Sequence, residues 1–223
     1  MAEPAVKVIL RTWRRALLCA YYRRFKSGRS FTARGVDYRY FYHPYNQTYS
    51  NERAVEIPIV WSMVQRVPPE RVLEVGNVLS HYFPTRHDVV DKYERAPGVH
   101  NVDVVDFRPP QPYDLIISIS TLEHVGFNEK PLEPGKPWRA IGHLQRCLSP
   151  QGQLVVTLPV GANPHLDRML HEGRIPLDDP LCLRRISRDN RWRETSWEEV
   201  RRARYGHPYR NANGLLVAMF PPA

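Results

Sequence analysis

Three stretches decide the fold: RVLEVGNVLS at residues 71–80, DVVDK at residues 88–92 and YDLIISISTLEHV at residues 113–125. The first is a short apolar run that ends at Gly76, where a glycine lets the backbone turn tightly. The second ends at Asp91. The third is a continuous apolar run of the kind that a buried parallel strand requires, and it closes on Glu123 and His124.

The same pattern continues on either side of these stretches. Short strands are predicted over residues 72–76, 87–91, 102–106, 113–120, 153–159, 181–187 and 214–220. A helix is predicted over residues 138–148, and the turn SPQG at residues 149–152 ends it. Strand, helix and strand of this length form a parallel unit. The sequence therefore predicts an α/β fold with a mostly parallel seven-stranded sheet and helices on both faces.

An acidic side chain at the end of the second strand indicates a nucleoside site. Asp91 can accept hydrogen bonds from both ribose hydroxyls of a cofactor, because ligands of open α/β sheets bind beyond the carboxyl ends of the strands. Gly76, at the end of the first strand, lies at the same edge of the predicted sheet.

These motifs together resemble class I S-adenosylmethionine-dependent methyltransferases over roughly residues 70–160. VLEVG at residues 72–76 is similar to their first motif, Asp91 to their ribose-binding acid, and Asp103 with Asp106 to the motif whose first acid contacts adenine. YDLI and LEHV are similar to their fourth-strand motif. The resemblance implies a Rossmann-like domain with S-adenosylmethionine as cofactor. The cofactor-binding residues that it implies are Glu74, Gly76, Asn77, Asp91, Lys92, Asp103, Val104 and Ser118.

One departure from the family's pattern lies in the first loop. The family has Gly-x-Gly-x-Gly after the first strand, whereas Val78 and Ser80 stand here at the second and third glycine positions. A β-branched residue adopts positive φ only at a cost, so we expect the loop to follow another path. A methyltransferase-like binding or scaffold protein without activity is the alternative that this departure raises.

The formal net charge of +9 is concentrated at the N-terminus. Residues 1–30 hold eight basic residues against Glu3 alone, a net charge of +7. Val6, Ile9, Leu10, Trp13 and Leu17 recur at helical spacing, so residues 1–35 are predicted as a basic amphipathic helix that precedes the methyltransferase domain at residues 36–223. We expect this helix to pack on its own domain or to form a homodimer; peripheral membrane contact is the alternative.

The length of the apolar runs and the cysteine content indicate where the protein works. No apolar run approaches the roughly 18 residues of a membrane span, and three scattered cysteines argue against a disulfide framework, so a reducing cytoplasm is expected.

Residues 36–69 are rich in tyrosine. Such side chains either form a satellite core or, with interleaved polar residues, form a lid; the family resemblance favours the lid.

The acceptor chemistry is predicted from residues near the strand ends. A hydroxyl acceptor needs a base, and His124 with Glu123 is the expected catalytic pair; a divalent ion such as Mg²⁺ held there is one alternative, and a purely structural turn is the other. Tyr45, His165 and Asp167 are the predicted substrate-binding residues.

The class of acceptor is predicted by what the fourth strand lacks. It continues as SIST at residues 118–121 instead of the Asp/Asn-Pro-Pro-aromatic signature of base amino-group methylation, which makes nucleic acid an unfavoured substrate. The short chain and its tyrosine-rich segment resemble bacterial sugar and natural-product O-methyltransferases, among them actinobacterial polysaccharide enzymes. We therefore expect O-methylation of a small carbohydrate-like acceptor. An RNA methyltransferase is the alternative, favoured by basicity.

Overall fold

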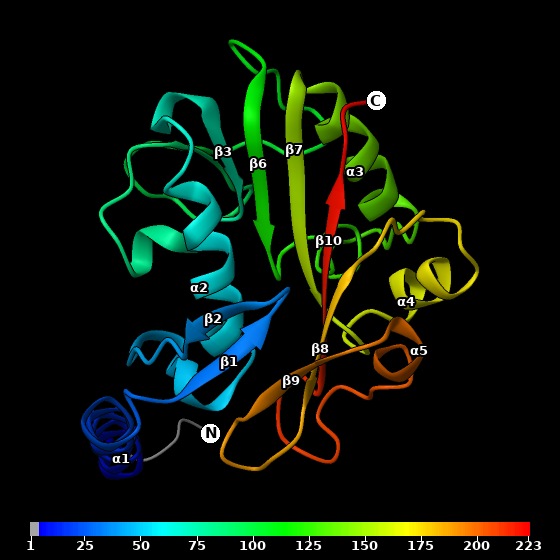
Figure 1. Cartoon of the computed structure of the whole chain (residues 1–223). Coiled ribbons are helices and arrows are strands. Elements are labelled where there is room, and N and C mark those ends of the chain that lie inside the picture. Colours follow the sequence, from blue (N-terminus) through cyan, green and yellow to red (C-terminus); the bar gives the residue numbers. More distant parts are fainter. Residues whose placement is uncertain (1–4) are drawn as a thin grey trace.

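The computed structural model describes residues 5–223, with side chains from Trp13 onward. Glu3 and the side chains of Val6, Lys7, Ile9, Leu10 and Arg11, which were part of the predicted amphipathic face, lie outside the described residues. Helix α1 spans Ala5–Phe25. The protein is built around one large sheet with helices on both sides, and α1 lies at its periphery beside a two-stranded hairpin (Figure 1).

The large sheet has eight strands in the order β5-β4-β3-β6-β7-β10-β8-β9. Their bounds are β3 Val72–Val75, β4 Asp88–Val90, β5 Val99–His100, β6 Tyr113–Ile119, β7 Leu148–Pro159, β8 Leu181–Arg185, β9 Trp192–Thr195 and β10 Gly214–Phe220. Strands β3 to β7 pair in parallel, whereas β10 is antiparallel to β7 and β8, and β9 is antiparallel to β8. The sheet is mostly parallel as predicted, but seven strands was one too few, because β9 adds an edge strand.

The third predicted strand was also misplaced. The strand at this edge is β5 at Val99–His100, and residues 102–106 turn instead. The backbone N–H of Asp106 donates to the Asp103 carbonyl at 2.9 Å, and the Asp103 side chain accepts from the N–H of Val105 at 3.3 Å. An aspartate side chain that accepts a hydrogen bond from the backbone N–H two residues later favours a turn over a strand. The neighbouring valines favour a strand, so the sequence pattern did not indicate this turn.

Helices cover both faces of the sheet, as predicted (Figure 1). Helices α3 (Lys136–Arg146), α4 (Pro164–His171) and α5 (Trp197–Val200) pack their apolar side chains into one core cluster. Helix α2 (Arg53–Val64) packs on the opposite face, together with the hairpin β1 (Ser30–Ala33) and β2 (Val36–Arg39). Three short 3-10 helices complete the fold: η1 Tyr45–Ser50, η2 Pro69–Arg71 and η3 Leu79–His81.

The N-terminal helix is shorter than the 1–35 segment assigned to it and uses a different face for packing. Cys19 is buried, and Tyr22 stacks on Tyr49 with ring centroids 5.3 Å apart, whereas Trp13 and Leu17 are 65% and 67% exposed. In the part of the predicted apolar face that the structure describes, Trp13 and Leu17 thus do not pack on the domain. A homodimer or a membrane surface as its partner stays a prediction.

The tyrosine-rich segment at residues 36–69 forms packed structure. Tyr40, Tyr42 and Tyr49 are buried and belong to the core cluster under α2. The satellite-core interpretation therefore accounts for these aromatic side chains. The polar residues of the segment have another place, since Asn51 and Arg53 line a cleft at the edge where the parallel strands end.

Candidate active site

A cavity of about 200 Å³ lies where the chain leaves β3 and β4. The sheet order reverses at β3, which has β4 on one side and β6 on the other, and ligands of open α/β sheets bind at such a switch point. Five valines and eight side chains with polar or charged groups form its walls, together with Gly76. The lining residues are Val75, Gly76, Val90, Asp91, Lys92, Tyr93, Val102, Asp103, Val104, Thr121, His124, Val125, Asn128 and Glu129.

Gly76 begins the loop over this cavity, and two constraints require glycine there. Its φ is +86°, a conformation that L side chains rarely adopt. A Cβ at this position would also overlap the side chain of Thr121, which follows β6. The loop therefore packs closely against Thr121 at the end of β6.

Glu74 determines the path of the loop that lacks the second and third glycines. Its Oε1 accepts from the backbone N–H groups of Val78 at 3.0 Å and Leu79 at 2.8 Å, and its Oε2 lies 2.8 Å from His87 Nε2. Val78 has a φ of −107°, so the loop needs no positive φ there and closes into η3. The expected alternative path is therefore a short 3-10 turn capped from below by a buried carboxylate.

Asp91 is held at the end of β4 with acceptor capacity to spare. Its Oδ1 accepts from the N–H groups of Tyr93 and Glu94, both at 2.8 Å, while Oδ2 accepts only from the N–H of Asn77 at 3.2 Å. A carboxylate oxygen has two lone pairs, so Oδ2 can accept a further hydrogen bond from a ligand hydroxyl. The residues present therefore fit a ribose at this end of the cavity.

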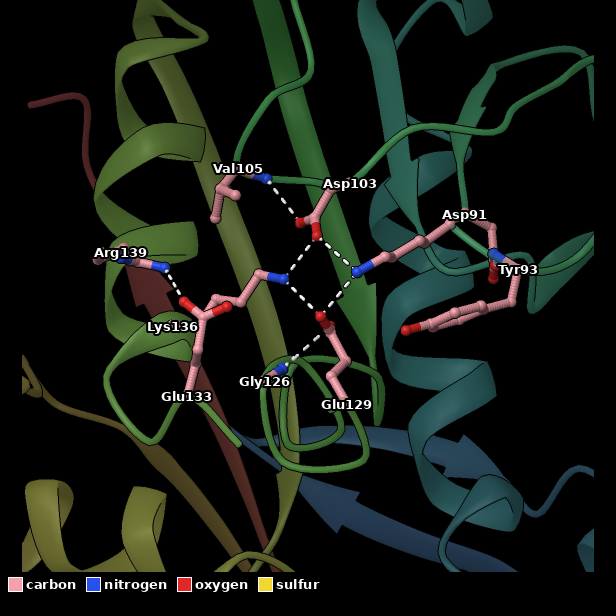
Figure 2. Close-up of polar contacts among 10 residues, drawn as sticks. Asp91, Tyr93, Asp103, Val105, Gly126, Glu129, Glu133, Lys136 and Arg139 are labelled. Carbon is pink, nitrogen blue, oxygen red and sulfur yellow. Dashed lines mark hydrogen bonds and ion pairs between the residues drawn. The ribbon is translucent and has the colours of Figure 1, made fainter. Parts of the chain in front are cut away.

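Four charged side chains alternate in sign beside the cavity, and three of them line it (Figure 2). Lys92 Nζ lies 2.9 Å from Asp103 Oδ2 and 2.7 Å from Glu129 Oε2; Lys136 Nζ lies 2.5 Å and 2.6 Å from the same two oxygens. Burial would raise the pKa values of Asp103 and Glu129, but hydrogen bonds from Lys136 and Lys92 lower both below their ordinary values. The Lys92 side chain thus joins two acidic side chains of the cavity lining.

The structure brings five of the eight predicted cofactor residues to this cavity: Gly76, Asp91, Lys92, Asp103 and Val104. It places the other three elsewhere. Glu74 lies beneath the loop, and Asn77 touches the site only through its backbone N–H to Asp91. Ser118 is fully buried within β6, so it lies inside the sheet. Thr121, Asn128, Glu129 and Lys136 were missed, because they come from loops and helices around the motifs.

A second, larger cleft of about 400 Å³ adjoins the first. Its lining residues are Asn46, Asn51, Glu52, Arg53, Ser120, Glu123, His124, Phe127, Asn128, Pro159, Ala162, Tyr205 and Asn211. His124 and Asn128 line both spaces. A molecule in the first cavity and a molecule in the cleft therefore meet at these two side chains.

Glu123 and His124, the predicted catalytic pair, lie at this junction. His124 Nε2 is 3.7 Å from Glu123 Oε1, and Asn163 Nδ2 donates to the Glu123 carbonyl at 2.7 Å, which fixes the turn. Glu123 Oε2 is buried and has no hydrogen-bond partner in the protein. Burial raises the pKa of Glu123 well above its ordinary value. Partial desolvation and the nearby Arg53 lower the pKa of His124, although its side chain is 57% exposed.

The N-terminal turn of α2 supplies the remaining charges near the cleft. Arg53 donates to the Ile119 carbonyl at 2.9 Å and lies 3.7 Å from Glu56 Oε2. Glu56 Oε1 accepts from Ser120 and from Thr157 Oγ1. Glu52 Oε2 accepts from the N–H of Ala212 at 3.2 Å. Helix α2 is thus tied through charged groups to the ends of β6, β7 and the segment before β10.

None of the predicted substrate residues lines the cleft. Tyr45 stacks on His81 with centroids 4.1 Å apart, because positive φ at Asn46 turns the chain there. His165 belongs to α4, and its ring lies 6.1 Å from that of Phe127. Asp167 accepts from the N–H of Gly161 at 3.1 Å and stabilises the loop after β7. The structure thus places these three side chains in local contacts outside the cleft lining, and their role in acceptor binding stays a prediction.

Some of the residues near the cleft that were not predicted nevertheless stand in a recognisable sequence pattern. Glu52, Arg53 and Glu56 begin a helix that is otherwise apolar, and charged residues at helical spacing on a buried helix indicate a site. Tyr205 and Asn211 had no such signal, because the loop before β10 reaches the cleft only in the folded chain. In the described part of the chain, no three His, Cys, Asp or Glu side chains converge as a metal site.

Comparison with known proteins gives matches in structure alone. No protein-family model matches the sequence, and no curated protein matches it. The N-methyltransferase NodS from Bradyrhizobium japonicum, solved with S-adenosyl-L-homocysteine, matches with a TM-score of 0.47 and 16% identity over 76% of this chain and 86% of NodS. A TehB-like S-adenosylmethionine-dependent methyltransferase from Corynebacterium glutamicum matches with a TM-score of 0.43 and 16% identity over 72% and 85%.

The sugar N-methyltransferase KedS8 from Streptoalloteichus matches with a TM-score of 0.39 and 15% identity over 76% of this chain and 88% of KedS8. All three matches have TM-scores of 0.47 or less and identities of 16% or less. They are distant, so the function of this chain is argued from its own two adjoining spaces.

Proposed function

We propose that this chain transfers a methyl group from S-adenosylmethionine to a hydroxyl of a small polar, carbohydrate-like acceptor. The observation that carries the proposal is the junction: the cavity at the switch point and the cleft beside it share His124 and Asn128. Methyl transfer is an in-line displacement, so donor and acceptor must meet end to end. Two adjoining spaces with a titratable pair between them suit that requirement.

The cofactor's nucleoside half fits the smaller cavity. When bound, S-adenosylmethionine supplies a sulfonium methyl group to the acceptor. Asp91 Oδ2 would accept from the ribose, and the valine walls would hold the flat base by apolar contact. Asp103, although paired with two lysines, lies beside Val104 at the end where the base would be read.

The acceptor's proton is the second requirement. His124 is a suitable base, because its lowered pKa leaves the ring neutral at pH 7 and able to accept a proton. Glu123, 3.7 Å away, would stabilise the imidazolium that forms. Glu123 therefore serves as an assisting group, and His124 is the group that contacts the acceptor.

Asn128 determines which ring nitrogen is free. Its amide nitrogen lies 2.9 Å from His124 Nδ1. If the amide donates there, the proton of the neutral ring is on Nε2; if the amide is rotated, its oxygen accepts from Nδ1–H and Nε2 is free to act as base. We propose the second arrangement during turnover, with Asn128 as a positioning residue.

The partner and location predictions fit the same proposal. We propose that the enzyme works in the cytoplasm, in keeping with Cys19, Cys147 and Cys182, which are all free and buried. Within residues 5–223, no helix is long and apolar enough to cross a membrane. The exposed Trp13 and Leu17 on α1 suit a homodimer contact first and a peripheral membrane contact second.

The test has two stages. Calorimetry with S-adenosylmethionine and S-adenosylhomocysteine should give micromolar or tighter binding; absence of binding would leave only the scaffold alternative. Release of S-adenosylhomocysteine should then be measured with monosaccharides, oligosaccharides and tRNA as acceptors, with and without a chelator. Turnover on sugars that survives chelation supports the base mechanism, whereas faster turnover on tRNA would establish the RNA methyltransferase instead.

A further inference from the structure

The cleft carries more negative than positive charge in its described walls. Glu52, Arg53 and Glu123 line it, and Glu56 lies directly behind Arg53. These four groups come from two places only, the start of α2 and the turn after β6. Three carboxyl groups thus face one guanidinium group in a space that is partly closed to water.

The single guanidinium group does not satisfy all three carboxyl groups. Arg53 Nη1 donates to the Ile119 carbonyl, and its 3.7 Å approach is to Glu56. Glu56 also accepts from Ser120 and Thr157, and Glu52 accepts from the N–H of Ala212. Glu56 Oε2 and Glu123 Oε2 are both buried without a hydrogen-bond partner. Arg53 lies 3.7 Å from the oxygen of Glu56, whereas Glu123, with a side chain only 3% exposed, has just the 3.7 Å approach of His124 to its other oxygen.

An unpartnered carboxylate in such a place carries a free-energy cost, because burial removes water without supplying another donor. The pKa values respond in the expected direction: burial raises that of Glu52, and burial with Glu56 raises that of Glu123. A cation in the cleft would supply both the missing donor and the missing charge. A neutral hydroxyl would supply the donor only.

The other titratable side chains around Glu123 also favour the binding of a cation. His124 is kept neutral at pH 7, and Tyr205 keeps its proton because burial and the carboxylates Glu52 and Glu123 raise its pKa. Arg53 is the one cation among these neighbours, and its contacts run to α2 and β6. An ammonium group carries three N–H donors and a full charge, which suits two carboxyl groups at the wall of one cleft.

We propose that the acceptor carries an ammonium group that binds to the carboxylate of Glu123 in the cleft, whose wall Glu52 also lines. This inference rests on the proposed function and narrows its acceptor to amino-group-bearing sugars or similar small amines. Glu123 is then a specificity-determining residue as well as an assisting group. The ammonium serves recognition, and a neighbouring hydroxyl meets His124.

The experiment measures acceptor binding to the full chain saturated with S-adenosylhomocysteine. The probes are D-glucosamine, D-galactosamine and D-mannosamine, each compared with its N-acetyl derivative and its parent sugar by calorimetry. We expect at least one amine to bind tenfold or more tightly than both of its partners at pH 7.5. Its affinity should increase as pH rises from 5 to 7, where the amine stays charged, since Glu123 must lose its proton to accept the ammonium.

Two variants separate this inference from its alternatives. Glu123→Gln should remove the amine preference and its pH dependence while leaving S-adenosylhomocysteine affinity within twofold; Glu198→Gln, at an exposed position, is the control. Glu52→Gln, whose side-chain oxygen can still accept from Ala212, should reduce the preference partially and serves if the first variant does not fold. If no amine outperforms its partners, or if Glu123→Gln retains the preference, the inference is overturned. Loss of S-adenosylhomocysteine binding by the wild-type chain would instead overturn the proposed function.

Discussion

Glu74 Oε2 lies 2.8 Å from His87 Nε2, beneath the loop that covers the smaller cavity. Both side chains are buried, and the other oxygen of Glu74 holds two backbone N–H groups of the loop. The hydrogen bonds of this one carboxylate therefore hold the loop in a path that needs no glycine at the second and third positions of the family's pattern. The loop is shaped by hydrogen bonds from below, which makes Glu74 a residue of the scaffold and only indirectly of the cofactor site.

Glu74→Ala should destabilise the protein by roughly 2 to 4 kcal/mol, because it leaves the buried N–H of Leu79, the part-buried N–H of Val78 and the buried His87 without a partner. The free energy of unfolding from urea denaturation checks this. Glu70→Ala, at an exposed position in η2, is the control and should change the stability by less than about 0.5 kcal/mol. Equal stabilities of the two variants would remove Glu74 from its assigned role.

Asp91→Ala should weaken S-adenosylhomocysteine binding by about 1.5 to 3 kcal/mol if a charge-assisted hydrogen bond to the ribose is lost. Calorimetry on the folded variant measures this, and Asp106→Ala, at an exposed position outside the cavity lining, is the control. Asp91→Asn should lose less, since the amide oxygen can still accept. Unchanged affinity in Asp91→Ala would sink the ribose assignment.

His124→Ala should lower kcat by about a hundredfold or more with little effect on S-adenosylhomocysteine affinity, as expected for loss of a general base. The wild-type kcat should decline as pH falls below 6.5, the ordinary pKa of histidine, because a base with a lowered pKa is protonated only below that value. Steady-state kinetics between pH 5 and 8 check both, with His171→Ala as the exposed-histidine control. Normal turnover in His124→Ala would leave this turn with a structural role.

Glu123→Gln should gain stability relative to the wild type as pH rises. The folded-state pKa of Glu123 is raised above its ordinary value of 4.5, so the folded chain retains a proton that the unfolded chain has lost, and stability decreases above pH 4.5 until the folded pKa is passed. Glutamine does not ionise and escapes this loss. Melting temperatures measured at pH 4 and pH 8 test the difference; if the gap between variant and wild type does not widen with pH, Glu123 is not the buried acid described here.

Lys136→Met should destabilise the protein by about 3 kcal/mol, because it leaves Asp103 and Glu129 with Lys92 alone. Arg139→Ala is the matched control: its ion pair with Glu133 at 2.6 Å is exposed, so the loss should stay below about 1 kcal/mol. The pKa values of Asp103 and Glu129 are lowered, so the stability that they contribute is present above their ordinary values of 3.8 and 4.5 and is lost as pH falls below them. The difference between the two variants should accordingly shrink at pH 3, and a constant difference would contradict the paired-charge account.

The sequence by itself determined the parallel core of this protein. Continuous apolar runs such as residues 113–119, followed by acidic or glycine residues, have few other stable arrangements, because they must be buried on both faces and must end at an edge open to ligands. That is why Gly76, Asp91 and Glu123 with His124 could be placed correctly at one edge. The part of the site that lies at the strand ends could therefore be predicted from the local sequence pattern.

The tertiary structure alone decided which side chains complete the site. The Asp103 turn replaced a predicted strand because a local side-chain hydrogen bond outweighed valine propensity, and Tyr45, His165 and Asp167 were drawn into contacts with their own loops. Tyr205 and Asn211 reach the cleft from the loop before β10. Such convergence depends on how helices and loops pack across the sheet, and no spacing within the sequence encodes that geometry.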